Sequence, residues 1–175
     1  MDSLLTSRTL VRATMLVATL AWAGGEALMR RPGRLDELAR STWTAGVVLA
    51  CLHVFLAFYL VYGWDHEAAV AATVQQSAGR FGTGWRGAIY LNYLFVMLWL
   101  ADVCWWWIRP AAHRSRPIWI ERTRFLLFAF MFVNGAIVFA AGAGRLVGIV
   151  AVGIAAAGHM RRLRSPAPPW DQRAW

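Results

Sequence analysis

Five long apolar segments, separated by short polar stretches, limit what this chain can fold into more than any other feature. The segments cover about residues 10–29, 43–64, 87–108, 119–141 and 146–160. A helix needs about 20 mainly apolar residues to cross a bilayer, and the first four segments reach that length. The fifth is shorter, and the arginines beyond it can extend toward the lipid headgroups or leave it crossing only in part. We therefore expect an all-α, polytopic integral membrane bundle of five transmembrane helices.

The composition supports placement in a lipid bilayer. Of the 175 residues, 59% are hydrophobic and 15% are charged, whereas soluble domains average about 25% charged residues. All 18 basic residues are arginines, and the formal net charge is +9. Because the arginines cluster at the ends of apolar segments rather than on one solvated face, we expect no nucleic-acid partner. The two cysteines, Cys51 and Cys104, lie in no metal-ligand spacing.

The distribution of the arginines predicts the orientation. Segments 30–40, 109–124 and 159–175 contain four, five and four arginines, and the opposite side contains five in total. Because positive residues accumulate in cytoplasmic loops, we predict an outside N-terminus and a cytoplasmic C-terminus, in a cell membrane of the prokaryotic inner-membrane type. Residues 1–23 share the outline of a secretory signal peptide, and cleavage there is the alternative.

One transmembrane bundle, residues 1–160, accounts for most of the chain. Residues 65–78 contain no glycine or proline and are rich in alanine, so we expect a helical extension there outside the membrane. Residues 161–175 contain three prolines and are predicted to form a disordered cytoplasmic tail.

Small residues predict where helices approach one another closely, because helix association in lipid depends on close van der Waals contact. Gly144 and Gly148 form such a pair in the fifth segment, and Ala21 and Gly25 form one in the first. The motif fits packing within one chain and also fits a homo-oligomer interface.

Two carboxylates, Asp102 and Glu26, lie inside apolar segments near their predicted cytoplasmic ends. The charged form of such a residue costs roughly 2.5 kcal/mol or more on insertion scales, so each needs a partner or a proton. One interpretation is a clamp between helix ends, and another is a proton or cation relay that continues through His53 near the midplane. The arginines at the right depth for a clamp are Arg30, Arg31, Arg40, Arg122 and Arg124.

The predicted outer half contains a second set of polar residues. Asp65, His66 and Glu67 are consecutive, and because helical positions point about 100° apart, they cannot all bind one metal. His66 with one acid remains a candidate metal or acid–base site, and Asp65 capping a solvated helix is the alternative. Asn92 and Asn134 are expected to line a polar pocket, if one forms there, or to bond neighbouring helices.

The motifs assign neither a catalytic residue nor a cofactor. A membrane haem at His53 would need a second axial ligand, and no other histidine lies at that depth. Neither a phosphate-binding loop nor a dinucleotide-binding motif nor a nucleophile elbow is present.

Three functions fit this sequence. The favoured hypothesis is a non-catalytic accessory or scaffold subunit of a membrane complex, embedded in the bilayer with other subunits or with copies of itself. The alternatives are a small proton- or ion-coupled transporter that uses Asp102 and His53, and a metal-dependent or redox protein with an outer-face site at Asp65, His66 and Glu67. We lean against an enzyme, because the chain contains no complete catalytic constellation.

Overall fold

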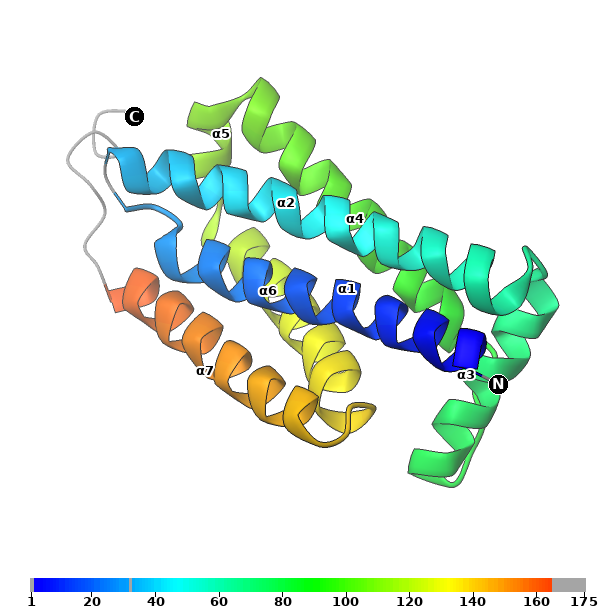
Figure 1. The fold of residues 1–175 in the computed structure, drawn as a ribbon. Helices are drawn as coiled ribbons and strands as arrows, with labels where there is room; N and C mark the ends of the chain where they lie inside the picture. The colour runs from blue at the N-terminus through cyan, green and yellow to red at the C-terminus, as the bar shows by residue number, and fades with distance from the viewer. Residues whose placement is uncertain (1, 32, 165–175) are drawn as a thin grey trace.

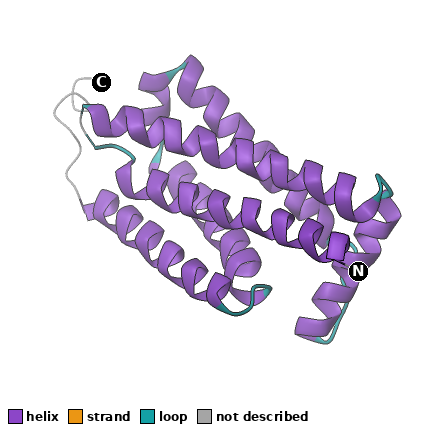
Figure 2. Ribbon diagram, viewed as in Figure 1, coloured by secondary structure: helices purple, strands orange, loops and turns teal. Residues whose placement is uncertain are grey.

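A computed structural model of the chain describes residues 2–31 and 33–164, and every regular element within them is helical (Figure 2). The long helices are α1 (Asp2–Leu28), α2 (Arg34–Ala57), α4 (Ala88–Ile108), α6 (Ile118–Val133) and α7 (Ala143–Arg164). Two π-helical segments, η1 (Phe58–Tyr62) and η2 (Asn134–Val138), continue α2 and α6. The predicted all-α class is confirmed.

These five helices lie side by side along one axis, and a further helix lies at each end of the bundle (Figure 1). α3 (His66–Phe81) lies near the N-terminus, and α5 (Pro110–Arg114) lies at the opposite end with the turn between α1 and α2. We call these the α3 end and the α5 end. α1 packs along both α2 and α7 and lies between them.

The predicted extension over residues 65–78 forms a separate helix, α3. The chain leaves η1 through two consecutive residues with left-handed backbone angles, Gly63 and Trp64. Asp65 then caps α3, because its carboxylate accepts the backbone N–H of Ala68 at 3.1 Å. A capping acid satisfies one of the free N–H donors in the first turn of a helix, so the break at Gly63 is followed at once by a new helix.

The last helix extends further than the sequence indicates. α7 continues to Arg164, so the first four residues of the predicted disordered tail are helical. Two of them contact α1: Arg161 donates to the carbonyl of Ala27 at 2.8 Å, and Arg162 donates to the carbonyl of Glu26 at 3.0 Å. The remaining predicted tail, 165–175, lies outside the described residues.

Three helices in the described part of the chain are long and apolar enough to cross a membrane. They are Arg34–Tyr62, Ala88–Ile108 and Ala143–Arg164. The helices α1 and α6 do not meet that standard, and both contribute charged side chains to the interior, among them Glu26, Glu121 and Arg124. This finding supports a helical membrane protein.

Aromatic side chains fill the middle of the bundle. We call this set the aromatic layer; it consists of Trp22, Trp43, Phe95, Trp99, Phe128 and Phe132. Trp22 stacks on Phe132 with ring centroids 4.5 Å apart, and Trp99 meets Phe128 edge to face at 5.3 Å. Gly46 of α2 makes room for this packing, since a Cβ there would lie 2.5 Å from the Trp99 ring.

The small residues of the predicted packing motifs differ in their surroundings. A Cβ on Gly148 would lie 2.2 Å from the carbonyl oxygen of Ala136, and one on Gly25 would lie 2.8 Å from the Trp43 ring. Ala21 faces Gly46, with its Cβ 3.4 Å from where a Cβ on that glycine would lie. Gly144 has no neighbour within 4 Å of its Cβ position. Within this chain, therefore, Gly148 is a packing residue and Gly144 is not.

We predict that Gly148→Ala destabilises the fold by about 1–3 kcal/mol, because the new methyl group forces α7 away from η2. Gly153→Ala on the same helix is the matched control, since nothing lies within 4 Å of its Cβ position. The control is expected to leave stability unchanged or to raise it through helix propensity. Thermal unfolding in detergent, followed by tryptophan fluorescence, measures both variants, and equal effects would contradict the packing role.

Candidate functional site

Glu26, on the last full turn of α1, is completely buried and lies between two guanidinium groups. Arg124 of α6 donates from Nη1 to its Oε1 at 2.5 Å. Arg162 of α7 forms an ion pair with its Oε2. The predicted intramembrane acid of the first segment therefore joins three helices.

Glu121, on the first turn of α6, is a second buried acid, and it shares Arg124 and Arg162 with Glu26. Its Oε1 accepts Nη2 of Arg124 at 3.1 Å and lies 3.3 Å from Nη2 of Arg162. Its Oε2 pairs with Nε of Arg116, in the turn between α5 and α6. Arg30 approaches the same oxygen at 3.9 Å.

Asp102 of α4 is the third buried acid and also has an arginine partner. Arg116 donates from Nη1 to Oδ1 at 2.9 Å, and the indole N–H of Trp43 donates to Oδ2 at 2.9 Å. The Trp43 ring lies below Arg124, whose guanidinium carbon is 4.8 Å from the ring centroid. Trp43 thus joins Asp102 and the aromatic layer to the other two acids.

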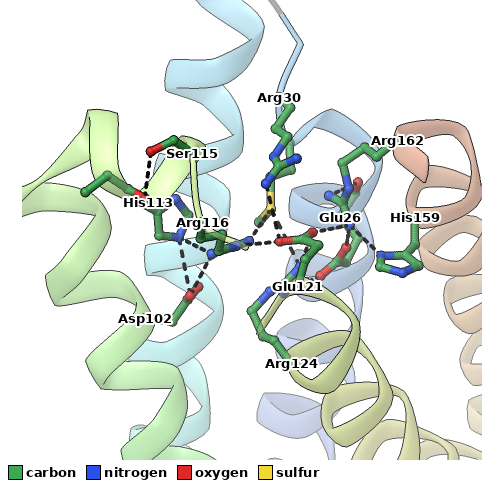
Figure 3. Close-up of polar contacts among 12 residues, drawn as sticks. Glu26, Arg30, Asp102, His113, Ser115, Arg116, Glu121, Arg124, His159 and Arg162 are labelled. Atoms are coloured by element: carbon green, nitrogen blue, oxygen red, sulfur yellow. Dashed lines mark hydrogen bonds and ion pairs between the residues drawn. The ribbon is translucent and has the colours of Figure 1, made fainter. Parts of the chain in front are cut away.

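These contacts form one continuous chain of charges across the α5 end of the bundle (Figure 3). We call it the ion network; it consists of Glu26, Asp102, Arg116, Glu121, Arg124 and Arg162. Three carboxylates face three guanidinium groups, so the formal charges balance. A buried charge is strongly destabilising without a partner, and here every member has at least one.

His113 of α5 lies beside Asp102 and is buried. Nη1 of Arg116 lies 2.5 Å from His113 Nε2, which is itself 3.3 Å from the Asp102 carboxylate. A guanidinium group can only donate and a carboxylate can only accept, so Nε2 can form a hydrogen bond with only one of these two neighbours, depending on the tautomer. Burial, with the positive charge of Arg116 in support, holds the pKa of His113 below its ordinary value, although Asp102 acts in the opposite direction.

His159 of α7 stacks on Phe125 with ring centroids 3.9 Å apart, and its Nδ1 lies 3.2 Å from Arg162. The ligand atoms of Glu26, Glu121 and His159 all lie within 4.8 Å of one another. A cation there would have to displace guanidinium groups from both carboxylates. The charge balance of the ion network therefore fits ion pairing better than a metal site.

The histidine predicted to lie inside the membrane, His53, does not join the ion network. Its Nδ1 lies 2.8 Å from the carbonyl oxygen of Val11 and 3.4 Å from the hydroxyl of Thr14, both on α1. His53 instead lines a cavity of about 890 Å³ toward the α3 end, together with Asn92 and Asn134. Neither Asp102 nor Glu26 lines that cavity. The aromatic layer lies between the two regions, since Trp99 comes between Phe95 and Asp102 along α4.

The three consecutive polar residues 65–67, at the start of α3, contact three different partners. Asp65 caps the helix, Nδ1 of His66 lies 3.2 Å from the hydroxyl of Tyr93, and Glu67 pairs with Arg86 at 2.9 Å on the surface. None of the three belongs to a cluster of possible metal ligands in the described residues. Asn92 does not meet this group, and it lies in the cavity instead.

Sequence analysis found the acids Glu26 and Asp102 but missed most of their partners. Of the five arginines considered, Arg124 belongs to the ion network and Arg30 touches it. Arg40 instead lies 4.1 Å above the Trp107 ring. Glu121, Arg116 and Arg162 were missed, because they lie at the boundaries of apolar segments, where a charged residue looks solvated. Their only sequence signal was that Glu26 and Asp102 need cationic partners near one predicted membrane face.

Comparisons with protein families, curated proteins and solved structures find no match for this chain. The geometry described above therefore carries the functional argument alone.

We predict that Arg116→Gln lowers the free energy of unfolding by about 3–5 kcal/mol, because it leaves Asp102 and Glu121 buried with too few cations. Arg86→Gln is the control, because both side chains of its pair with Glu67 are exposed. That loss is expected to cost at most about 1 kcal/mol. Chemical denaturation in detergent compares the two variants, and a similar cost for both would contradict the structural role of the ion network.

We predict that His113 makes the protein less stable in mild acid. The folded state lowers its pKa, so the unfolded state binds more protons once the pH falls below the ordinary histidine value of about 6.5. This contribution to stability is complete above about pH 6.5 and is lost progressively below it. Unfolding temperatures at about pH 7.5 and about pH 5.5 should differ less in His113→Gln than in the wild type. An unchanged difference would show that other groups cause the pH dependence.

Proposed function

We propose that the protein is a five-span integral membrane protein of a cell membrane that acts as a non-catalytic accessory or scaffold subunit. Its N-terminus lies outside and its C-terminus in the cytoplasm, so the α5 end is cytoplasmic. Its partners are the lipid bilayer and either other membrane subunits or a second copy of the chain.

The five-span arrangement is supported by the way α1 and α6 pack beside the three more apolar helices. Their buried charged residues, Glu26, Glu121 and Arg124, form ion pairs inside the bundle and do not face its lipid-facing surface. A helix can cross a bilayer with ionised groups when they face the bundle interior and pair there. The arginine-rich segments that predict the cytoplasmic side also lie at the α5 end.

A single observation carries the non-catalytic part of the proposal: each buried carboxylate of the ion network is held by arginine, and none lines the cavity. A proton carrier or a general acid needs a carboxylate that can exchange a proton with substrate or water. A carboxylate that is paired with guanidinium groups does not exchange a proton in this way, and it holds the helices in position. The site is better suited to holding the ends of four helices together than to chemistry.

The same geometry counts against the transport alternative. A relay from His53 to Asp102 needs one polar path, and buried rings of the aromatic layer such as Trp99 lie between the two residues. The Val11 carbonyl also occupies the His53 nitrogen that would begin such a path.

Proton flux into liposomes tests the proposal directly. Reconstituted wild-type protein should dissipate an imposed pH gradient no faster than protein-free liposomes do, because each buried carboxylate in the described part of the chain has an arginine partner. Asp102→Asn, reconstituted in parallel, should behave in the same way. Flux in the wild type that Asp102→Asn abolishes would overturn the proposal in favour of a transporter.

The accessory role is tested by native mass. Protein extracted from its own membrane in mild detergent should belong to a particle larger than the 19.6 kDa chain, once bound detergent is subtracted by light scattering. A single copy with no partner would contradict a scaffold role while leaving the membrane topology intact.

A further inference from the structure

We propose that the cavity toward the α3 end binds a single-chain amphiphile with an anionic headgroup, which Arg12 holds at the mouth. This inference goes beyond the scaffold role, and it uses none of the residues of the ion network.

The cavity has the size and walls of a small-molecule site. Its volume of about 890 Å³ lies within the range of roughly 300–1,000 Å³ that is typical of ligand pockets. Residues of α1, α3, α4, α6 and η2 line it, with His53 and Ala50 from α2. One part of its wall closes where Phe81 of α3 meets Phe139 edge to face, with centroids 5.9 Å apart.

Polarity changes along the depth of the cavity. The polar lining groups Arg12, Gln76 and Thr83 come from the parts of α1, α3 and the following turn nearest the α3 end. Deeper along the helices the lining is mainly apolar, with Leu16 of α1 and Phe95 of the aromatic layer. From Arg12 to Thr19 the depth is about 10 Å, at 1.5 Å per helical residue. A charged mouth above a mainly apolar floor, which also includes the polar residues Thr19 and His53, fits a molecule with a headgroup and a chain.

The positive charge of Arg12 in the cavity lining indicates an anionic headgroup. Among the described residues that line the cavity, Arg12 alone has a side chain with a permanent charge, and none is an acid. Arg12 has no carboxylate partner within 4 Å in the described part of the chain, whereas the arginines of the ion network all do. Guanidinium groups bind carboxylate and phosphate through paired, charge-assisted hydrogen bonds. An anion in the cavity would supply the partner that the chain does not.

Two amides can add neutral donors to this anion site. Gln76 and Asn92 line the cavity, and neither side chain makes a hydrogen bond to another described residue. Asn134 is partly engaged, because its Nδ2 donates to the carbonyl of Phe130 at 2.8 Å. Carboxylate and phosphate share the chemistry that these groups recognise, so a fatty acid and a lysophospholipid are the two possible sources of the ligand.

Native mass spectrometry of the full chain in a neutral detergent tests the proposal with three probes of similar chain length. Oleate supplies a carboxylate, lysophosphatidic acid supplies a phosphate, and monoolein supplies an uncharged headgroup. We expect one bound molecule of an anionic probe, and occupancy by monoolein that is lower by roughly tenfold or more, as for loss of a charge-assisted hydrogen bond. Comparison of the first two probes identifies the source.

Arg12→Gln should reduce binding of the anionic probe by roughly tenfold or more. Arg8→Gln is the matched control, because Arg8 lies one turn earlier on α1 and does not line the cavity; it should bind as the wild type does. Equal binding by Arg12→Gln and the wild type, or several molecules bound without preference for charge, would overturn the proposal.

A second variant separates loss of binding from loss of folding. Leu16→Trp should fill the apolar floor and abolish binding while Arg12 remains in place. Circular dichroism and thermal unfolding verify that each variant is folded. If Leu16→Trp is folded and binds oleate and lysophosphatidic acid as the wild type does, the ligand does not enter this cavity and the proposal fails.

Discussion

The fold depends on Arg124, because this one side chain holds two buried acids from different helices. Its guanidinium group binds Glu26 of α1 and Glu121 of α6, and it lies over the Trp43 ring of α2. Replacing such a network with apolar residues of the same volume is often neutral or stabilising. Its value therefore lies in specificity: with the charges in place, a shift in the register of α1, α6 or α7 would leave an ion unpaired in an apolar interior.

The aromatic layer gives the bundle two chemically separate ends. Trp43 connects the layer to the ion network, since its N–H binds Asp102 while its ring stacks on Phe128. Phe95, on the other side, lies in the layer and also lines the cavity. These large rings pack closely and lie between the paired charges at the α5 end and the cavity at the α3 end.

Apolar periodicity and length were sufficient to predict the helices, since each of the five apolar segments contains one long helix. The sequence also located Glu26 and Asp102 as acids that need partners. It could not identify Arg116 or Arg162, because pairing across α4, α6 and α7 depends on how the helices are arranged in space, and no local pattern encodes that arrangement. The break at Gly63 and Trp64 was missed for a similar reason: Trp64 is not a glycine, yet it adopts a left-handed conformation.

The contrast between paired and unpaired arginines separates structural from binding roles in this chain. Arg116, Arg124 and Arg162 have carboxylate partners and are each less than a tenth exposed, so their charges serve the fold. Arg12 is exposed to a cavity whose described lining residues include no acid. A guanidinium group that has no carboxylate partner in the described part of the chain and lies at such a cavity fits the proposed anion site, because guanidinium binds carboxylate and phosphate through paired hydrogen bonds.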